Sequence, residues 1–143
     1  MDMDLKLEIG TIEMVTKFLD QLITIDHSHF GNESWSNESF LSPLPEKFSN
    51  SLIMLDENKV IGYAIVSKKE NNFHIHRFVI SKQLIARGYG KKLLDHLEKK
   101  CSYSTLSLKV NKQNIKAIIF YLCQDFKFNQ AQNNYYLMLK NGK

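Results

Sequence analysis

The residues best suited to chemistry are two glycines and the cations beside them, at the start of a segment with helical spacing. The run Arg87-Gly88-Tyr89-Gly90-Lys91 follows an apolar, strand-like segment that ends at Ile80. Glycines let a backbone approach a ligand closely, the amides at a helix start converge, and the helix dipole adds partial positive charge. A bare G-x-G is more often a tight turn, but the adjoining cations make this run a candidate anion-binding loop.

Two other phosphate-binding loops are disfavoured by their own spacing. A nucleotide P-loop requires G-x-x-x-x-G-K-[ST], which the sequence lacks. The dinucleotide fingerprint G-x-G-x-x-G requires glycine or alanine where Leu93 stands, and it normally follows the first strand of its fold. What remains is a glycine loop that follows a three-stranded meander.

Strands and helices alternate around this loop. Apolar runs and alternation predict strands over 5–9, 51–55, 60–66, 73–80, 106–110, 126–128 and 135–139. Helical spacing predicts one helix that begins after Thr11, one over Gly88–Cys101 and one after Asn114. A short helix is expected inside the loop between His27 and Phe48. This order predicts an α/β fold with one mixed sheet and helices on its faces.

Spacing also assigns side chains to the faces of two helices. In Gly88–Cys101 the apolar positions form one stripe, whereas Glu98 belongs to the charged, outward side. The helix after Asn114 carries an apolar stripe at i, i+3, i+4 and i+7, formed by Ile115, Ile118, Ile119 and Leu122. Cys101 and Cys123 are too few for a disulfide scaffold or a four-cysteine zinc site, so both are predicted to be small buried hydrophobes.

Composition limits the class of protein. The chain has 143 residues, 43% hydrophobic and 24% charged, which fits one globular domain over residues 1–143. The net charge of +4 comes mostly from scattered lysines, without a nucleic-acid recognition motif or a basic-aromatic stripe. No apolar stretch reaches ~18 residues and no signal-peptide pattern begins the chain. We therefore expect a cytoplasmic protein that contacts neither membrane nor nucleic acid.

With its surroundings, the glycine loop resembles the central motif of the GNAT N-acetyltransferases. In that family a strand precedes [RQ]-x-x-G-x-[GA], which opens a helix whose amides hold the coenzyme A pyrophosphate; here the strand 75–80 precedes Arg87-Gly88-Tyr89-Gly90-Lys91. A second signature, N-x-x-A followed by an aromatic-tyrosine pair, matches Asn114-Ile115-Lys116-Ala117 and Phe120-Tyr121. The resemblance implies a single-domain GNAT fold, with a mixed, mostly antiparallel central sheet flanked by helices.

The resemblance also implies an acetyl-CoA-dependent enzyme and assigns residues to this cosubstrate. The loop formed by Ala86, Arg87, Gly88, Tyr89, Gly90 and Lys91 is expected to hold the pyrophosphate. The backbone of Phe78, Val79 and Ile80 is expected to pair with the pantetheine arm, where a β-bulge would open space and an amide would face the developing oxyanion. Asn114 is expected to contact the coenzyme. Tyr121 is expected to contact it and to protonate the departing thiolate, although by residue type alone it would be a core aromatic.

The acceptor amine must lose a proton, and His76 is the candidate base because histidine titrates near neutral pH. His74 and His76 share one face of their strand with Phe78 if the strand is regular. Glu70 or Glu33 could serve instead, and a surface or core histidine is an equal alternative. An H-x-H pair can also bind zinc, but no third ligand stands at useful spacing, so no metal is expected.

The expected reaction moves an acetyl group to a primary amine of a small molecule or protein by direct attack in a ternary complex. No cysteine lies at the loop to form a covalent intermediate. Ile85 stands where the family usually has arginine or glutamine, and Asp125 stands where it usually has glycine. Ile85 motivates an alternative, a non-catalytic acyl-CoA-binding regulatory module of the same fold.

The resemblance places the acceptor between segments 31–48 and 130–135. Trp35 and Phe40 could form an apolar wall there, and Asp26, Glu33 and Glu38 could attract a cationic amine, although an exposed acidic face is the commoner explanation for such carboxylates. Many family members form dimers, so the resemblance also allows a homodimer.

Overall fold

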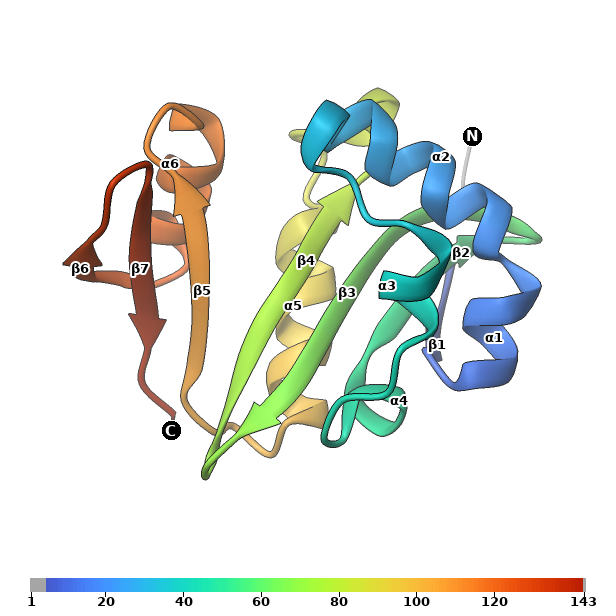
Figure 1. The fold of residues 1–143 in the computed structure, drawn as a ribbon, viewed down its shortest axis with the longest axis horizontal. Coiled ribbons are helices and arrows are strands. Elements are labelled where there is room, and N and C mark those ends of the chain that lie inside the picture. The colour runs from blue at the N-terminus through green and yellow to red at the C-terminus, as the bar shows by residue number, and fades with distance from the viewer. Residues whose placement is uncertain (1–4, 143) are drawn as a thin grey trace.

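The computed structural model describes residues 5–142, which form one seven-stranded sheet with helices on both faces (Figure 1). The strands are β1 (Leu5–Ile9), β2 (Leu52–Asp56), β3 (Lys59–Lys69), β4 (Asn72–Ile80), β5 (Leu106–Asn111), β6 (Lys127–Ala131) and β7 (Tyr135–Lys140). The α-helices are α1 (Ile12–Lys17), α2 (Leu19–Phe30), α3 (Asn37–Leu41), α4 (Lys47–Asn50), α5 (Tyr89–Lys100) and α6 (Ile115–Cys123). Two 3₁₀ turns, η1 (Gly31–Glu33) and η2 (Lys82–Leu84), complete the described elements.

The sheet has the order β1-β2-β3-β4-β5-β7-β6, and every neighbouring pair is antiparallel except β4 and β5. This confirms the predicted mixed, mostly antiparallel sheet. One hydrophobic core joins the sheet to α5 and α6 and includes Leu93 and Leu97. A second core, on the opposite face, joins it to α1, α2 and α3 through Val15, Leu22 and Phe40. Burial of apolar surface on both faces holds the two helical layers in place.

β4 and β5 pair over only part of their length. Their register runs from Phe73 opposite Leu106 to Ile75 opposite Leu108, after which β4 continues to Ile80 and β5 continues to Asn111 without pairing. Figure 1 shows the two strands diverging toward their C-terminal ends. The backbone of residues 78–80 therefore presents an edge toward β5 that has no strand partner.

A β-bulge lies in β4 at His76. On β3, Ile65 pairs with Arg77 and the next residue, Val66, pairs with Ile75, so His76 is the extra residue of β4. The bulge shifts the alternation of side chains. Phe78 packs against the α5 core, whereas Arg77 reaches Asp26 on the other face. A face common to His74, His76 and Phe78 requires a regular strand; because of the bulge, the two histidines stay together and Phe78 lies on the opposite face. The bulge lies at His76, before the stretch 78–80 where the resemblance implies one.

The helical layer before β2 is more divided than predicted. The single helix expected after Thr11 is broken at Phe18, whose backbone is not helical (φ −104°, ψ 14°) and whose side chain is buried. The break lets α1 and α2 cross the sheet in different directions while both keep an apolar side on it (Figure 1). The segment from His27 to Phe48 holds the end of α2, η1, α3 and the start of α4 instead of one short helix. No helix among the described residues has the length and apolar character needed to cross a membrane.

Three predicted side-chain environments are corrected by the structure. Glu98 is buried because its carboxylate accepts a hydrogen bond from Lys140 Nζ at 2.8 Å. Cys101 is buried as predicted, but Cys123 is exposed. The stripe predicted on α6 is wrong in orientation: the helix turns Ile118 and Tyr121 toward the sheet and leaves the other three residues of that stripe exposed, namely Ile115, Ile119 and Leu122.

Candidate active site

The loop between β4 and α5 has a backbone geometry suited to an anion. Ala86 and Gly88 both have positive φ angles, 66° and 87°. Residues with positive φ that alternate with residues of negative φ turn successive N–H groups toward one side, and these groups form a concave anion site. Apart from chain neighbours, no atom lies within 4 Å of the position that a Cβ would take at Gly88. The loop surface is therefore open to a ligand.

The start of α5 adds free amide donors to this loop. Gly88 is the N-cap and has no side chain to cap the helix. Lys92 N donates to Gly88 O at 3.2 Å, so the amides of residues 89–91 precede the first helical hydrogen bond and have no carbonyl partner within α5. No acidic side chain lies in the first turn to neutralise the helix dipole.

Cationic side chains border the loop. Arg87 and Lys91 are exposed, and Lys91 Nζ lies 3.1 Å from the carboxylate of Asp95 one turn along α5. An exposed ion pair of this kind contributes little to stability. Lys91 is therefore free to leave Asp95 and turn toward a ligand. Ile85 is 49% exposed and forms an apolar edge to the loop.

Close packing joins the glycine loop to the second motif. A Cβ at Gly90 would lie 3.0 Å from the ring of Phe120, so only glycine lets α5 and α6 approach this closely. Phe120 stacks on Phe78, with ring centroids 5.8 Å apart, and the ring of Tyr121 lies 6.1 Å from that of Phe78. The structure thus brings together Phe78, Gly90 and Tyr121, which the sequence analysis selected from separate segments.

The α6 residues of the second motif have clear local roles. Asn114 is the N-cap, and its side-chain oxygen accepts a hydrogen bond from Ala117 N at 3.3 Å. This contact explains the N-x-x-A spacing, because a cap residue bonds to the amide three positions on. Burial raises the pKa of the Tyr121 phenol, so the hydroxyl stays protonated throughout the neutral range. A protonated phenol can donate a proton or a hydrogen bond.

His76 is held by a serine of the neighbouring strand. Its Nε2 lies 2.7 Å from Ser67 Oγ, and no residue within 5–142 forms a hydrogen bond with its Nδ1. His74 is held in the same way, with its Nδ1 2.8 Å from Ser107 Oγ on β5. The two imidazole rings lie edge to face, 5.0 Å apart. The histidines are therefore fixed as a pair where β4 and β5 begin to separate.

Both histidines are neutral at pH 7. Burial lowers the pKa of His74 to about 4, with further contributions from His76 and from the charges of Lys69 and Lys109. Burial also lowers the pKa of His76, with contributions from Lys47, Arg77 and Lys69. A neutral imidazole has a lone pair that can accept a proton, which is what a general base needs.

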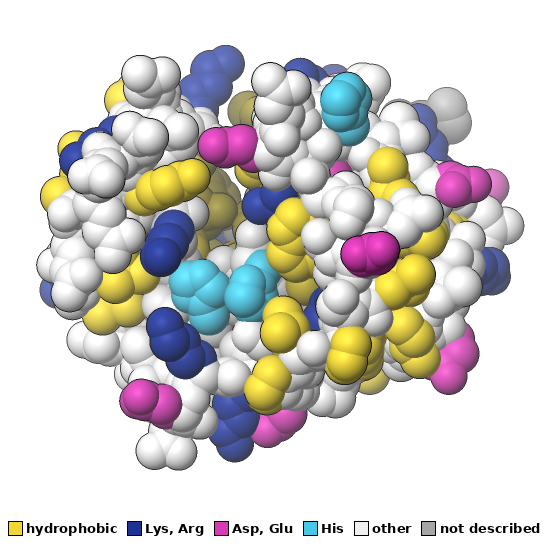
Figure 2. Space-filling model, in the orientation of Figure 1, with side chains coloured by type: hydrophobic (Ala, Val, Ile, Leu, Met, Phe, Trp, Pro, Cys, Tyr) yellow, Lys and Arg dark blue, Asp and Glu magenta, His cyan; other side chains and the backbone are white. Residues whose placement is uncertain are grey.

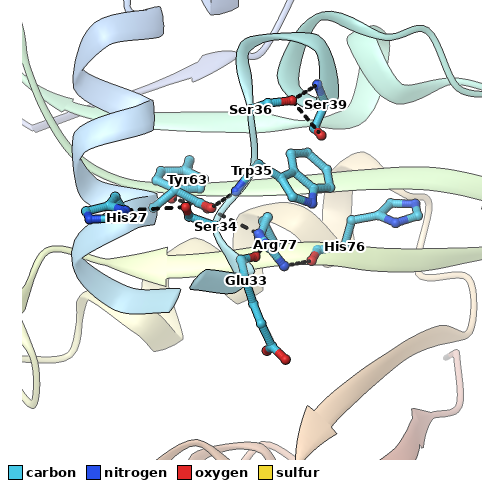
Figure 3. A network of polar contacts seen from close by, with 10 residues as sticks. His27, Glu33, Ser34, Trp35, Ser36, Ser39, Tyr63, His76 and Arg77 are labelled. Carbon is cyan, nitrogen blue, oxygen red and sulfur yellow. Dashed lines mark hydrogen bonds and ion pairs between the residues drawn. The ribbon is translucent and has the colours of Figure 1, made fainter. Parts of the chain in front are cut away.

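A buried network ties β4 to the helices that cover it (Figure 3). Asp26 on α2 is fully buried; its Oδ1 accepts from Tyr63 Oη at 2.8 Å and Arg77 Nε at 3.1 Å, and its Oδ2 accepts from Trp35 N at 2.6 Å. Arg77 also donates to Glu33 O at 2.7 Å, and its guanidinium lies over the rings of Phe30 and Trp35. This network fixes residues 30–35 beside His76, whose ring centroid lies 6.2 Å from that of Trp35.

Sequence reasoning missed the roles of Arg77 and Asp26. Asp26 was a candidate for attracting a cationic amine, but it is buried and already paired with Arg77, so it cannot meet a ligand. Arg77 received no role. The available signal was its residue type, because the chain contains only two arginines among many lysines and one of them interrupts an apolar strand. Arginine is favoured over lysine where several partners must be held by one planar group.

Lys47 is a second buried cation that sequence reasoning missed. Its Nζ donates to the carbonyl oxygens of Ser39, Phe40 and Ser42 at 3.0, 2.7 and 2.7 Å, which caps the C-terminal end of α3. Burial lowers the pKa of Lys47 to about 8. Within residues 5–142, no group of three or more His, Cys, Asp or Glu side chains is placed to hold a metal ion.

Solved structures share this fold over nearly the whole chain. Ard1 from Thermoplasma volcanium is similar at a TM-score of 0.81 and 17% identity, covering 95% of this chain and 96% of its own. The ribosomal-protein-S18-alanine N-acetyltransferase from Escherichia coli is similar at 0.79 and 17%, covering 95% and 92%. The PaiA N-acetyltransferase from Thermoplasma acidophilum, solved in complex with coenzyme A, is similar at 0.75 and 19%, covering 97% and 99%.

A sequence-family model also matches most of the chain. No curated protein matches the chain significantly. The family model described as an acetyltransferase (GNAT) domain matches residues 15–135, a range that includes the glycine loop, the histidine pair and α6. The chain therefore belongs to the GNAT family of acetyltransferases.

Proposed function

We propose that this acetyltransferase domain binds acetyl-CoA in the opening between β4 and β5 and transfers the acetyl group directly to a primary amine. The observation that carries the proposal is the unpaired edge of residues 78–80, which leads directly to the positive-φ loop at Ala86 and Gly88. An extended pantetheine arm can pair with a free strand edge, and a pyrophosphate fits converging amides at a helix start. One continuous surface thus suits both parts of the cosubstrate.

Each residue around this surface has a role in the proposed binding of acetyl-CoA. The amides of residues 86–91 and the Arg87 guanidinium would hold the pyrophosphate, with Lys91 beside them. Phe78, Val79 and Ile80 would pair with the pantetheine arm through their backbones, and an amide there would face the oxyanion that forms at the thioester carbonyl. Asn114 would contact the coenzyme from the start of α6. The coenzyme-bound structure of the similar PaiA protein supports coenzyme A as the ligand class.

His76 and Tyr121 supply the two proton transfers of the proposed reaction. The amine nitrogen attacks the acetyl carbon, the Nδ1 lone pair of His76 takes the amine proton directly or through water, and the carbon–sulfur bond breaks. Ser67 supports this role in the tautomer that the reaction requires, in which Nε2–H donates to Ser67 Oγ and the Nδ1 lone pair is free. Tyr121 then protonates the departing thiolate; burial raises its pKa, which keeps the hydroxyl protonated and available as the donor.

Ligand binding is tested by thermal unfolding with acetyl-CoA, coenzyme A, NADH and ATP in parallel. A ligand at 100 times its dissociation constant adds about 2.7 kcal/mol, which raises the melting temperature of a domain of this size by several degrees. We expect both coenzyme A species to raise it and NADH to leave it unchanged. Equal melting temperatures with all four ligands would overturn the assignment of the loop to coenzyme A.

Turnover is tested by release of the coenzyme A thiol with a panel of amines. Stabilisation by coenzyme A without acetylation of any amine would instead support the non-catalytic acyl-CoA-binding module. Ile85 favours the non-catalytic module, because it stands at the position where GNAT proteins usually have arginine or glutamine, and the loop therefore lacks that polar side chain.

A further inference from the structure

Among residues 5–142, no helix covers the β5 and β7 half of the sheet face that carries the histidine pair. Figure 1 shows α1 to α4 in front of the other half only. In β5, Leu106, Leu108 and Val110 belong to the α5 core, so Ser107 and Lys109 point to the open face. Figure 2 shows two neighbouring histidine side chains in a hollow of this face, between the helical layer and the β5 side, with Lys or Arg side chains next to them.

Two exposed lysines flank the histidine pair on this face. Lys109 follows Ser107 by two residues on β5, and Lys69 follows Ser67 by two residues on β3, so each points to the same side as the serine that holds a histidine. The charges of both lysines act on His74. Neither lysine forms an ion pair within residues 5–142.

Of the other charged side chains near this hollow, three cations already have partners and two carboxylates are exposed. Arg77 is paired with Asp26, Lys47 is bonded to three carbonyls, and Lys68 is paired with Glu46 at 3.3 Å. Glu70 follows Lys69 in the β3–β4 turn, and Glu33 is exposed, with its carboxylate pointing away from the Arg77 network in Figure 3. Lys69 and Lys109 therefore remain without an ion-pair partner among the described residues, beside the histidine pair.

We propose that the acceptor is an amine that also carries a carboxylate or phosphate, which Lys69 and Lys109 bind beside the His74–His76 pair. This inference rests on the proposed function, because it names the acceptor of that same site. Cations on a wall of the acceptor hollow attract an anionic group and repel polyamines. The neutral histidines add no charge of their own that would oppose a cationic amine approaching the base.

A matched panel of acceptors tests this selectivity. Phosphoethanolamine is compared with ethanolamine, and β-alanine with propylamine, so that each pair differs in the anionic group. Peptides of one length that begin Ser-Glu-Glu, Ser-Ala-Ala or Ser-Lys-Lys separate a peptide source of the anion from a small-molecule source. We expect kcat/KM to be about five- to tenfold higher for the anionic member of at least one series, and the ratio to fall as salt is added.

Charge-reversal variants assign the effect to the two lysines. In Lys69→Glu/Lys109→Glu the preference for the anionic member is expected to disappear or invert. Lys99→Glu/Lys100→Glu on α5 makes the same change in net charge at exposed positions on the opposite side of the sheet, so it controls for overall charge. Preference of the wild type for neutral or cationic acceptors, or equal loss of selectivity in both double variants, would overturn the inference.

A binding measurement separates failure of the inference from failure of the proposed function. Inorganic phosphate is titrated into the protein saturated with coenzyme A, and the imidazole resonances of His74 and His76 are followed by NMR. We expect both to shift in the wild type and in the α5 control but not in Lys69→Glu/Lys109→Glu. If no amine is acetylated, these shifts still support the anion site; their absence in the wild type overturns it, whatever the panel shows.

Discussion

Arg77 on β4, which is partly buried, and the fully buried Asp26 on α2 form an ion pair, 3.1 Å from Nε to Oδ1, beside the bulge residue His76. The same carboxylate accepts from Trp35 N, and Arg77 donates to Glu33 O. One ion pair therefore ties the strand that carries the candidate base to the segment expected to form a wall of the acceptor site. If the proposed function is correct, replacing either residue alters both the stability of the fold and the shape of the proposed acceptor site.

Replacement of Arg77 is expected to destabilise the fold strongly. Arg77→Gln leaves the fully buried Asp26 carboxylate without its cation, and breaking a buried pair in this way costs about 3–5 kcal/mol. Urea unfolding measures the loss. The double variant Asp26→Asn/Arg77→Gln should recover part of it, because it removes the unpaired charge. As a control, Lys68→Gln removes one partner of the exposed pair with Glu46 and should cost less than about 1 kcal/mol; similar losses in the two single variants would contradict this account.

Gly88 tests the anion-binding loop. Gly88→Ala puts a Cβ at a φ of 87° into space where no surrounding atom lies within 4 Å, so the change strains the loop and intrudes on the ligand without disturbing the core. We expect the dissociation constant of coenzyme A to rise about tenfold or more, as for loss of one hydrogen bond to a charged group.

Gly31→Ala is the matched control for that variant. Gly31 also has a positive φ, 54°, with no surrounding atom within 4 Å of its Cβ position, but it lies at the end of α2. Its ψ of −120° is a conformation that only glycine adopts readily, so Gly31→Ala should lose at least as much stability as Gly88→Ala and still keep its affinity for coenzyme A, as measured by isothermal titration calorimetry. Equal affinities of the two variants would remove the loop from the binding site.

Tyr121 tests the proposed general acid. Tyr121→Phe removes only the hydroxyl and keeps the ring contacts with Phe78, Phe120 and Phe126, so the fold should persist. We expect kcat to fall about 10²-fold with little change in coenzyme A affinity, the pattern of a group that acts in the transition state. A fall in affinity with unchanged kcat would make Tyr121 a binding residue.

The pH profile of kcat/KM tests His76. The active form of a base is the neutral one, and burial together with nearby cations lowers the pKa of His76 below 6.5. Activity should therefore persist as pH falls to 6.5 and decline only below it. His76→Gln should lower kcat/KM about 10²-fold and abolish this decline, whereas His96→Gln, at an exposed position on α5, should change neither. A decline that survives in His76→Gln belongs to another group.

Local signals made most elements of the fold predictable from the sequence. Asn114 caps α6 through an amide three residues on, and Gly88 is the N-cap of α5, so short-range spacing was enough at both places. The Asp26–Arg77 pair joins positions 51 residues apart, and no local pattern encodes such a contact. The bulge at His76 arises from the register between β4 and β3, which side-chain alternation within one strand cannot reveal.

The orientation of α6 shows the same limit. Four apolar residues at helical spacing predicted the helix, but the packing of Tyr121 against Phe78 and Phe126 decides which side of it is buried. Three of the four are left in solvent as a result, Ile115, Ile119 and Leu122. Glu98 was misplaced for a related reason: its partner, Lys140, comes from the last strand of the sheet.

The most direct test of the central claim is mass spectrometry of an amine panel incubated with the protein and acetyl-CoA that carries a deuterated acetyl group. The account predicts a deuterated amide on at least one primary amine, formed in equal amount to the free coenzyme A thiol, with both products formed about 10²-fold more slowly in Tyr121→Phe. Stabilisation by coenzyme A with no deuterated amide, or thiol release without an acetylated amine, would contradict transfer to an amine at this site.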